Sequence, residues 1–305
     1  MAVSSSFAAN KVKVGAYVND IQNIDLKTHS YTVDLYLWFK WTDPTFDPST
    51  SFEFTNPFES WGHTKELTYE KPEKLGSGEF YQVVRVQGRF SQKLPLYDYP
   101  FDRQNLVVSL ENTMGGTGHI EFILDENPLA VNKDLQIPGF QIGRVTLSTT
   151  EHSYPTNFGD SRVAPNEKYS RIVVNVPITR SMLTYALKLI FPTLCVMLSV
   201  ALIFFLSPMR VDARVGIGIT ALLTLVALQM TLNEELPEID YMMLMDKIYL
   251  AGYLFVIGVL AVVIRSARYE DRGERIKAER IDRLSLKTLT PLYLLAVVCI
   301  LLRVI

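Results

Sequence analysis

The sequence is poor in cysteine, with two in 305 residues. Both Cys195 and Cys299 lie in long apolar runs, where cysteine is more often a small packing residue than part of a disulfide or metal site. The motifs that carry enzyme chemistry are missing as well, since no Gly-rich phosphate loop, HExxH pair, Cys/His cluster or nucleophile elbow is present. We therefore expect no enzyme, no cofactor and no metal site, with modulation by Ca²⁺ only a secondary hypothesis.

The polar half of the chain has no basic patch, which excludes a nucleic-acid partner. Residues 1–178 hold 16 Lys and Arg against 21 Asp and Glu, a net charge of −5; the remainder holds 14 against 11, or +3, and the sum is −2. The start, Met1-Ala-Val-Ser-Ser-Ser, lacks the apolar run of a signal peptide, although this half reads as exported. We expect the chain to begin inside a longer protein, and what precedes Met1 stays open.

Residues 1–179 predict a β-sandwich of immunoglobulin-like topology. In the segment 28–41, Leu35, Leu37 and Phe39 form one face, and polar residues with two aromatics form the other. Turn signals then separate several further short strands. An exposed Tyr–Trp pair on the polar face needs a partner or a ligand, so Tyr36 and Trp38 are candidate binding residues.

Residues 180–305 predict a membrane domain of four helices, at about 182–206, 214–232, 246–264 and 286–305, with a short linker at 265–285. The linker is rich in Arg and Lys, and the turn after the second helix carries acids only. Because basic loops stay in the cytoplasm, the β-domain and the acidic turn are expected outside a cell (inner) membrane. The charged linker has helical character and is expected to extend the third and fourth helices into water.

The second of these helices carries an unusual stripe. Steps of three and four residues select an acid at each end, small or hydroxylated residues near one end and apolar residues above them. The stripe consists of Asp212, Gly216, Thr220, Leu223, Ala227, Met230 and Glu234. Such a stripe suits a water-filled axis shared by several copies. Ordinary helix packing through Gly and Thr is the alternative.

Several motifs in the expected order resemble the pentameric ligand-gated ion channels, the Cys-loop receptor superfamily. Trp41-Thr-Asp43 resembles the Trp-x-Asp of that family, and Tyr99-Pro-Phe-Asp102-Arg-Gln104 its signature loop. Ala213-Arg-Val-Gly-Ile-Gly-Ile-Thr220 is similar to the pore helix of glycine receptors. Gln92 and Leu106 stand where animal members carry the bracketing cysteines, and the linker is short, as in bacterial members. The resemblance covers about residues 11–305.

The resemblance implies a homopentamer in the lipid bilayer whose pore is lined by the stripe. It implies coupling of the sandwich to the pore through Asp25, Lys27, Phe101, Asp102, Arg180 and Pro237. It implies an agonist site between subunits, with Tyr154, Phe158 and Tyr169 on the hairpin flap, Trp61 and His63 on another loop, and Tyr36 and Trp38 across the interface. The agonist, whether a small molecule, a pH change or a divalent cation, and the resting state stay open.

A ring of five Asp212 carboxylates would select monovalent cations, and Leu223, Ala227 and Met230 would form the gate. The run resembling glycine receptors, together with the Pro that those receptors carry where Asp212 stands, favours anions instead. We expect cation selectivity, because a carboxylate ring acts on the ion directly. An anion channel of the same fold and a non-conducting membrane receptor are the alternatives.

Overall fold

The computed structural model describes residues 9–159 and 166–303 and divides into two compact units. The first unit comprises Met1–Leu94 and Arg103–Thr179, and the second comprises Pro95–Asp102 and Arg180–Ile305. The division lies at the predicted border of 1–179 and 180–305, except that the segment Pro95–Asp102, which includes most of the signature loop, belongs with the helices. Each unit is considered by itself.

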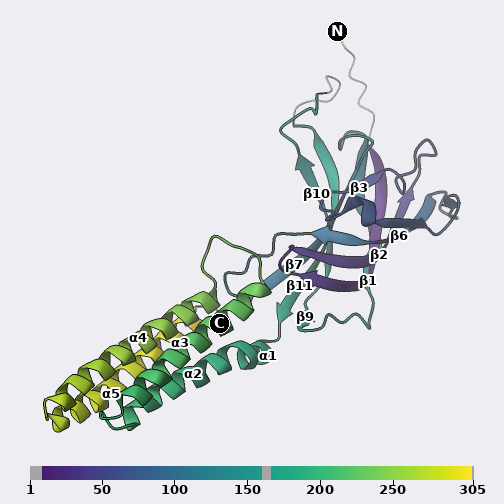
Figure 1. The fold of residues 1–305 in the computed structure, drawn as a ribbon. Helices are drawn as coiled ribbons and strands as arrows, with labels where there is room; N and C mark the ends of the chain where they lie inside the picture. Colours follow the sequence, from purple (N-terminus) through teal and green to yellow (C-terminus); the bar gives the residue numbers. More distant parts are fainter. Residues whose placement is uncertain (1–8, 160–165, 304–305) are drawn as a thin grey trace. The chain divides into compact units, whose positions relative to one another are not determined.

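The first unit is a sandwich of two β-sheets (Figure 1). One sheet has the strand order β4 (Thr64–Leu67), β6 (Phe80–Ser91), β2 (Ser30–Trp41), β1 (Asn10–Asp25) and β8 (Ile120–Val131), with β5 (Glu73–Lys74) on β6. The other has the order β10 (Thr146–Ser153), β11 (Lys168–Arg180), β7 (Arg103–Asn112) and β3 (Phe52–Phe54), with β9 (Phe140–Ile142) on β11. A short 3₁₀ turn, η1, spans Ser60–Gly62.

The core lies between these sheets. The face predicted on β2 is buried, since Leu35, Leu37 and Phe39 are fully enclosed. Tyr31 bridges the sheets: its hydroxyl donates to the carbonyl of Val107 at 2.6 Å and accepts from the amide of the same residue at 2.7 Å. A buried hydroxyl with two partners joins the layers without leaving a polar group unpaired. The predicted sandwich is confirmed.

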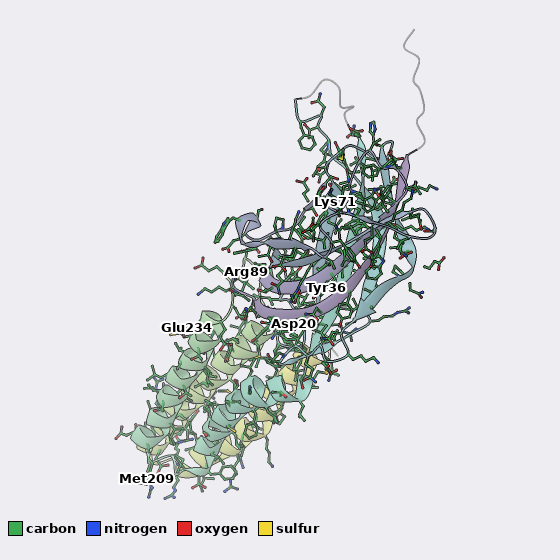
Figure 2. The ribbon with its side chains drawn as sticks, turned by 90° about the vertical axis from the view of Figure 1, so that its right-hand side faces the viewer. Asp20, Tyr36, Lys71, Arg89, Met209 and Glu234 are labelled. Carbon is green, nitrogen blue, oxygen red and sulfur yellow. The ribbon has the colours of Figure 1, made fainter. Side chains whose placement is uncertain are left out.

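The second unit contains four helices long and apolar enough to cross a membrane. The first span, Met182–Phe205, is made of α1 (Met182–Tyr185), the π-turn η2 (Ala186–Ile190), α2 (Phe191–Ala201) and η3 (Leu202–Phe205). The others are α3 (Val211–Glu234), α4 (Leu244–Asp271) and α5 (Arg275–Leu301). They lie side by side (Figure 1), and Met209 and Glu234 mark opposite ends of the bundle (Figure 2).

Proline explains the irregular first span. Pro192 lacks an amide hydrogen and its ring crowds the preceding turn, which a wider π-turn relieves. The hydroxyl of Thr193, which is fully buried, donates to the carbonyl of Leu189 at 3.1 Å. Within the helix, that side chain satisfies a carbonyl near the proline.

The predicted linker at 265–285 is mostly helical. α4 continues to Asp271 and α5 already begins at Arg275, so three residues remain between them, with Gly273 at a φ of 75°. The apolar span predicted at 286–305 is thus preceded by charged helical turns from Arg275 onward, in line with the expectation that the linker extends the third and fourth helices. Hydropathy detects only the part of a helix that lipid contacts, whereas Arg, Lys, Glu and Ala extend it into water because they favour helix.

Candidate functional site

The helix α3 divides cleanly into two faces. Its buried residues are Arg214, Gly218, Ala221, Leu225 and Leu232. All seven residues of the predicted stripe are exposed in the single chain: Asp212, Gly216, Thr220, Leu223, Ala227, Met230 and Glu234. Within each set the residues are three, four or seven positions apart, so each set lies along one side of the helix. The two sets are offset from each other by about half a turn and therefore lie on opposite sides. The exposed stripe is thus free to face water, lipid or another subunit.

Two glycines of α3 have different roles. A Cβ on Gly218 would lie 2.4 Å from Cδ2 of Leu260, so glycine lets α3 approach α4 closely. A Cβ on Gly216 would meet nothing within 4 Å. Packing explains the first glycine, but packing within the chain does not explain the second, which belongs to the stripe.

The stripe ends in charge. Asp212 lies in the first turn of α3, where a carboxylate is favoured by the helix dipole, and Glu234 is the last residue of the helix. Glu235 follows and is exposed too. Figure 2 shows Glu234 at one end of the bundle. Between the acids, the exposed side chains of Leu223, Ala227 and Met230 leave an apolar stretch.

The cation nearest to Asp212 within α3 is turned away from the stripe. Arg214 is fully buried, and its Nη2 donates to Oδ2 of Asp282 on α5 at 2.8 Å. A residue two positions from Asp212 on a helix lies off the stripe, but nothing in the sequence indicated the partner Asp282. The two residues are 68 positions apart, so only the packed bundle brings them together.

The signature loop contains a buried ion pair. Nε of Arg180 donates to Oδ1 of Asp102 at 2.9 Å, with side chains 4% and 3% exposed. The guanidinium also lies over the rings of Tyr99 and Tyr185, at 5.0 and 5.1 Å from their centroids. Burial raises the pKa of Tyr99 to about 12. Phe101 is half-buried beside this pair.

The residues just before this loop hold the turn that follows α3. Tyr97 stacks on Tyr241 with ring centroids 3.9 Å apart, and the hydroxyl of Tyr241 accepts the amide of Leu96 at 3.0 Å. The amide of Leu244, at the start of α4, donates to the carbonyl of Tyr97 at 2.9 Å. Pro237 is half-buried in this turn. Tyr97 is a coupling candidate that the motif comparison missed.

The other predicted coupling residues lie in the β1–β2 turn of the sandwich. The carboxylate of Asp25 accepts the hydroxyl of Thr28 at 2.7 Å and the amide of Lys27 at 2.9 Å, and it pairs with Arg89 at 3.3 Å. These contacts, chiefly the Thr28 hydroxyl, lower the pKa of Asp25. The side chain of Lys27 is exposed. This turn is therefore held in one shape by a carboxylate.

Aromatic rings gather on the β10–β11 hairpin. Tyr154 makes edge contacts with Phe158 and Tyr169, at centroid distances of 5.4 and 5.7 Å. His152 adds a fourth ring, 4.6 Å from Tyr154. The structure thus brings together the three residues predicted on the flap, and Phe158 leaves 65% of its side-chain surface open.

An ion pair between buried Glu111 and half-buried Arg171 supports this cluster. Tyr154 donates its hydroxyl to Oε2 of Glu111 at 2.9 Å, and Nε of Arg171 donates to Oε1 at 2.6 Å. Burial, followed by the Glu111 carboxylate, raises the pKa of Tyr154. Glu111 and Arg171 were missed by the sequence. They face each other across β7 and β11, in a strand register that no local sequence signal indicates.

The remaining predicted ligand residues lie elsewhere. Tyr36 and Trp38 are on β2, in the other sheet, so the single chain does not bring them to the hairpin cluster. Nε1 of Trp38 donates to Asp125 at 2.9 Å, and Arg85 lies 5.4 Å from the ring of Tyr36. Figure 2 labels Tyr36 in the sandwich.

Trp61 and His63 differ from each other. Trp61 is 85% exposed in η1. The ring of His63 instead packs on Phe54 and Phe90, and its Nε2 lies 2.7 Å from the carbonyl oxygen of Arg89. The imidazole is therefore used in packing, and its predicted contact with a ligand stays a prediction.

A sandwich followed by four apolar helices is the architecture of a multi-pass membrane protein with a folded domain outside the bilayer. Within residues 9–159 and 166–303, no group of three His, Cys, Asp or Glu side chains is placed to hold a metal ion. Modulation by Ca²⁺ stays a prediction.

Comparison with known proteins specifies the class. The family model described as "Neurotransmitter-gated ion-channel transmembrane region" matches residues 189–268. The chain is 22% identical to the acetylcholine-gated chloride channel subunit acc-1 of Caenorhabditis elegans, over 88% of this chain and 61% of that protein. It is 23% identical to the gamma-aminobutyric acid receptor subunit beta-4 of Gallus gallus, over 92% and 60%. It is 22% identical to the glycine receptor subunit beta of Rattus norvegicus, over 88% and 57%.

These matches confirm the resemblance to the pentameric ligand-gated ion channels, and the membrane region is the part matched by a family model. The chain spans 57–61% of the length of these three relatives. All three are animal receptor or channel subunits, in line with the expectation that the chain is not an enzyme. The predicted kinship with bacterial members stays a prediction.

Proposed function

We propose that the chain is one subunit of a homopentameric, cation-selective channel gated from outside the cell. The observation that carries the proposal is the exposed stripe of α3, whose seven predicted positions are all uncovered while Arg214 is buried. A stripe with a carboxylate at each end would be unfavourable if it faced lipid hydrocarbon. Five copies of the helix around a water-filled axis let the stripe face water instead. The β-domain would then lie outside the cell (inner) membrane.

Within the pentamer, the Asp212 carboxylates form a ring at the inner end, and such rings attract and select cations. Glu234 and Glu235 concentrate monovalent cations at the outer mouth. Gly216 and Thr220 leave space and hydroxyls for partly hydrated ions. Leu223, Ala227 and Met230, which are exposed in the same stripe, close the pore by excluding water, as hydrophobic constrictions do.

The agonist site is proposed between subunits. The hairpin cluster around Tyr154 would supply one wall, and Tyr36 and Trp38 of the next subunit the other. Because Glu111 is already paired with Arg171, its carboxylate is not available to a ligand. Recognition would therefore rely on ring faces, which suits a small amine through cation–π contact or an aromatic molecule.

Coupling would run through the signature loop. Asp102 and Arg180 fix that loop on the first membrane span, and Tyr97 joins it to the turn after α3. Asp25, Lys27, Phe101 and Pro237 are proposed to transmit the movement of the sandwich to the same turn. A change at the agonist site can then bias the pore only if this loop has two arrangements.

The test is the reversal potential of purified protein in planar bilayers under a NaCl gradient. We expect reversal near the sodium potential for the wild type and a shift toward zero for Asp212→Asn. The matched control is Asp271→Asn, which removes an exposed acid from the end of α4. Reversal near the chloride potential would establish the anion channel that the likeness to acc-1 favours. Absence of current across amines, pH and Ca²⁺ would favour a non-conducting receptor.

A further inference from the structure

The proposed selectivity faces a difficulty in the sequence of α3. The run Ala213–Thr220, which resembles anion channels, contains an arginine only two residues after Asp212. Five guanidinium groups beside five carboxylates would cancel the charge of the ring. Arg210, in the preceding turn, is exposed, so water and salt screen it. Arg214 is not screened in this way, because burial places it in a medium of low dielectric constant.

The structure contains a counter-charge for Arg214. Oδ2 of Asp282 accepts from Nη2 at 2.8 Å, and the two side chains are 0% and 4% exposed. Asp282 comes from α5, a different membrane helix from the one that carries the stripe. In the described residues, Nε and Nη1 of Arg214 have no hydrogen-bond partner, so this one contact fixes the guanidinium.

We propose that Asp282 is a positioning residue for ion selection, which holds Arg214 away from the pore and neutralises it there. The inference rests on the proposed cation channel. Per subunit, Asp212, Arg214 and Asp282 carry −1, +1 and −1, a sum of −1 at the inner end; without Asp282 the sum is 0. Because the field of a tight ion pair falls faster with distance than that of a single charge, ions in the pore sense Asp212 alone.

This role makes the α5 helix part of the selectivity apparatus although it supplies no residue to the stripe. It also explains how one helix can carry an anion-type run and still select cations. The arginine in the run serves packing between helices, and the charge that faces the axis comes from the residue before the run.

The experiment measures the ratio of sodium to chloride permeability in planar bilayers. Asp282→Asn leaves Arg214 uncompensated, and we expect the ratio to fall by about tenfold or more. The pair Arg214→Gln/Asp282→Asn removes both charges and should restore the ratio of the wild type. The control is Glu279→Gln, which removes an acid one turn earlier on α5 that pairs with Arg275 at 3.1 Å.

Asp282→Asn channels with the wild-type ratio would overturn the proposal, and so would a pair variant as impaired as the single one. If Asp282→Asn does not assemble, Arg214→Gln decides. It leaves the buried carboxylate of Asp282 without a partner, and at alkaline pH, where that carboxylate is ionised, the ratio should rise. No rise at alkaline pH would count against the role. A wild type that selects chloride or conducts nothing would refute the proposed function itself. A wild type that selects cations, with a ratio that Asp282→Asn does not change, would refute only the role of Asp282.

Discussion

The ion pair of Asp102 and Arg180 permits a quantitative prediction with an internal control. Its nitrogen–oxygen distance is 2.9 Å and its side chains are 3% and 4% exposed. The pair of Lys168 and Glu151 has a similar distance, 2.7 Å, but exposures of 62% and 56%. Removal of one partner from a buried pair costs about 3–5 kcal/mol, since a charge is left without compensation. Removal of one partner from an exposed pair costs about 0–1 kcal/mol.

Arg180→Ala should therefore destabilise the folded protein far more than Lys168→Ala. The assay is thermal unfolding of the detergent-purified protein, followed by size-exclusion chromatography after heating. Asp102→Ala should resemble Arg180→Ala, and the double variant should recover part of the loss because no lone charge remains. Arg180→Ala protein that survives heating as well as Lys168→Ala would refute the reasoning.

Two further predictions concern packing and pH. Gly218→Ala should destabilise the protein by about 1–3 kcal/mol in thermal unfolding, because the new Cβ meets Leu260. Gly216→Ala should leave the melting temperature unchanged or raise it, because its Cβ meets nothing within 4 Å and alanine favours a helix more than glycine does. An equal effect of both would argue against the close contact of α3 with α4. Thr28→Val removes the main cause of the lowered pKa of Asp25. The stability that this carboxylate contributes is present above its pKa in the unfolded chain and is lost as pH falls through its pKa in the folded protein. Acid unfolding of Thr28→Val, followed by tryptophan fluorescence, should therefore begin at higher pH than that of the wild type. An unchanged midpoint would contradict this prediction.

Local patterns were sufficient to predict the sandwich and the four spans. The alternation of Leu35, Leu37 and Phe39 follows from a strand with one buried side, and the spans follow from their length in apolar residues. The charged first turns of α5 are not part of an apolar span, and it was their helical character that indicated the extension of the helix. The site of the π-turn needed the structure, although Pro192 indicated that the span is irregular.

The candidate site was predictable where it depends on one element. The stripe of α3 follows from periodicity alone, and the flap aromatics lie on one hairpin. Pairs between distant elements were not accessible: Asp282 and Arg214 are 68 positions apart, and Glu111 and Arg171 are 60 apart. Their pairing depends on strand register and helix packing, which local sequence does not encode.

The measurement that tests the central claim most directly is the accessibility of single cysteines in α3. In a Cys195→Ser/Cys299→Ser background, Ala227→Cys belongs to the stripe, whereas Val226→Cys is exposed in the single chain but off the stripe. A charged, membrane-impermeant thiol reagent applied from the β-domain side should reduce current through open Ala227→Cys channels and leave Val226→Cys channels unchanged. Block of Val226→Cys with Ala227→Cys unaffected would show that the stripe faces away from water and would contradict the account.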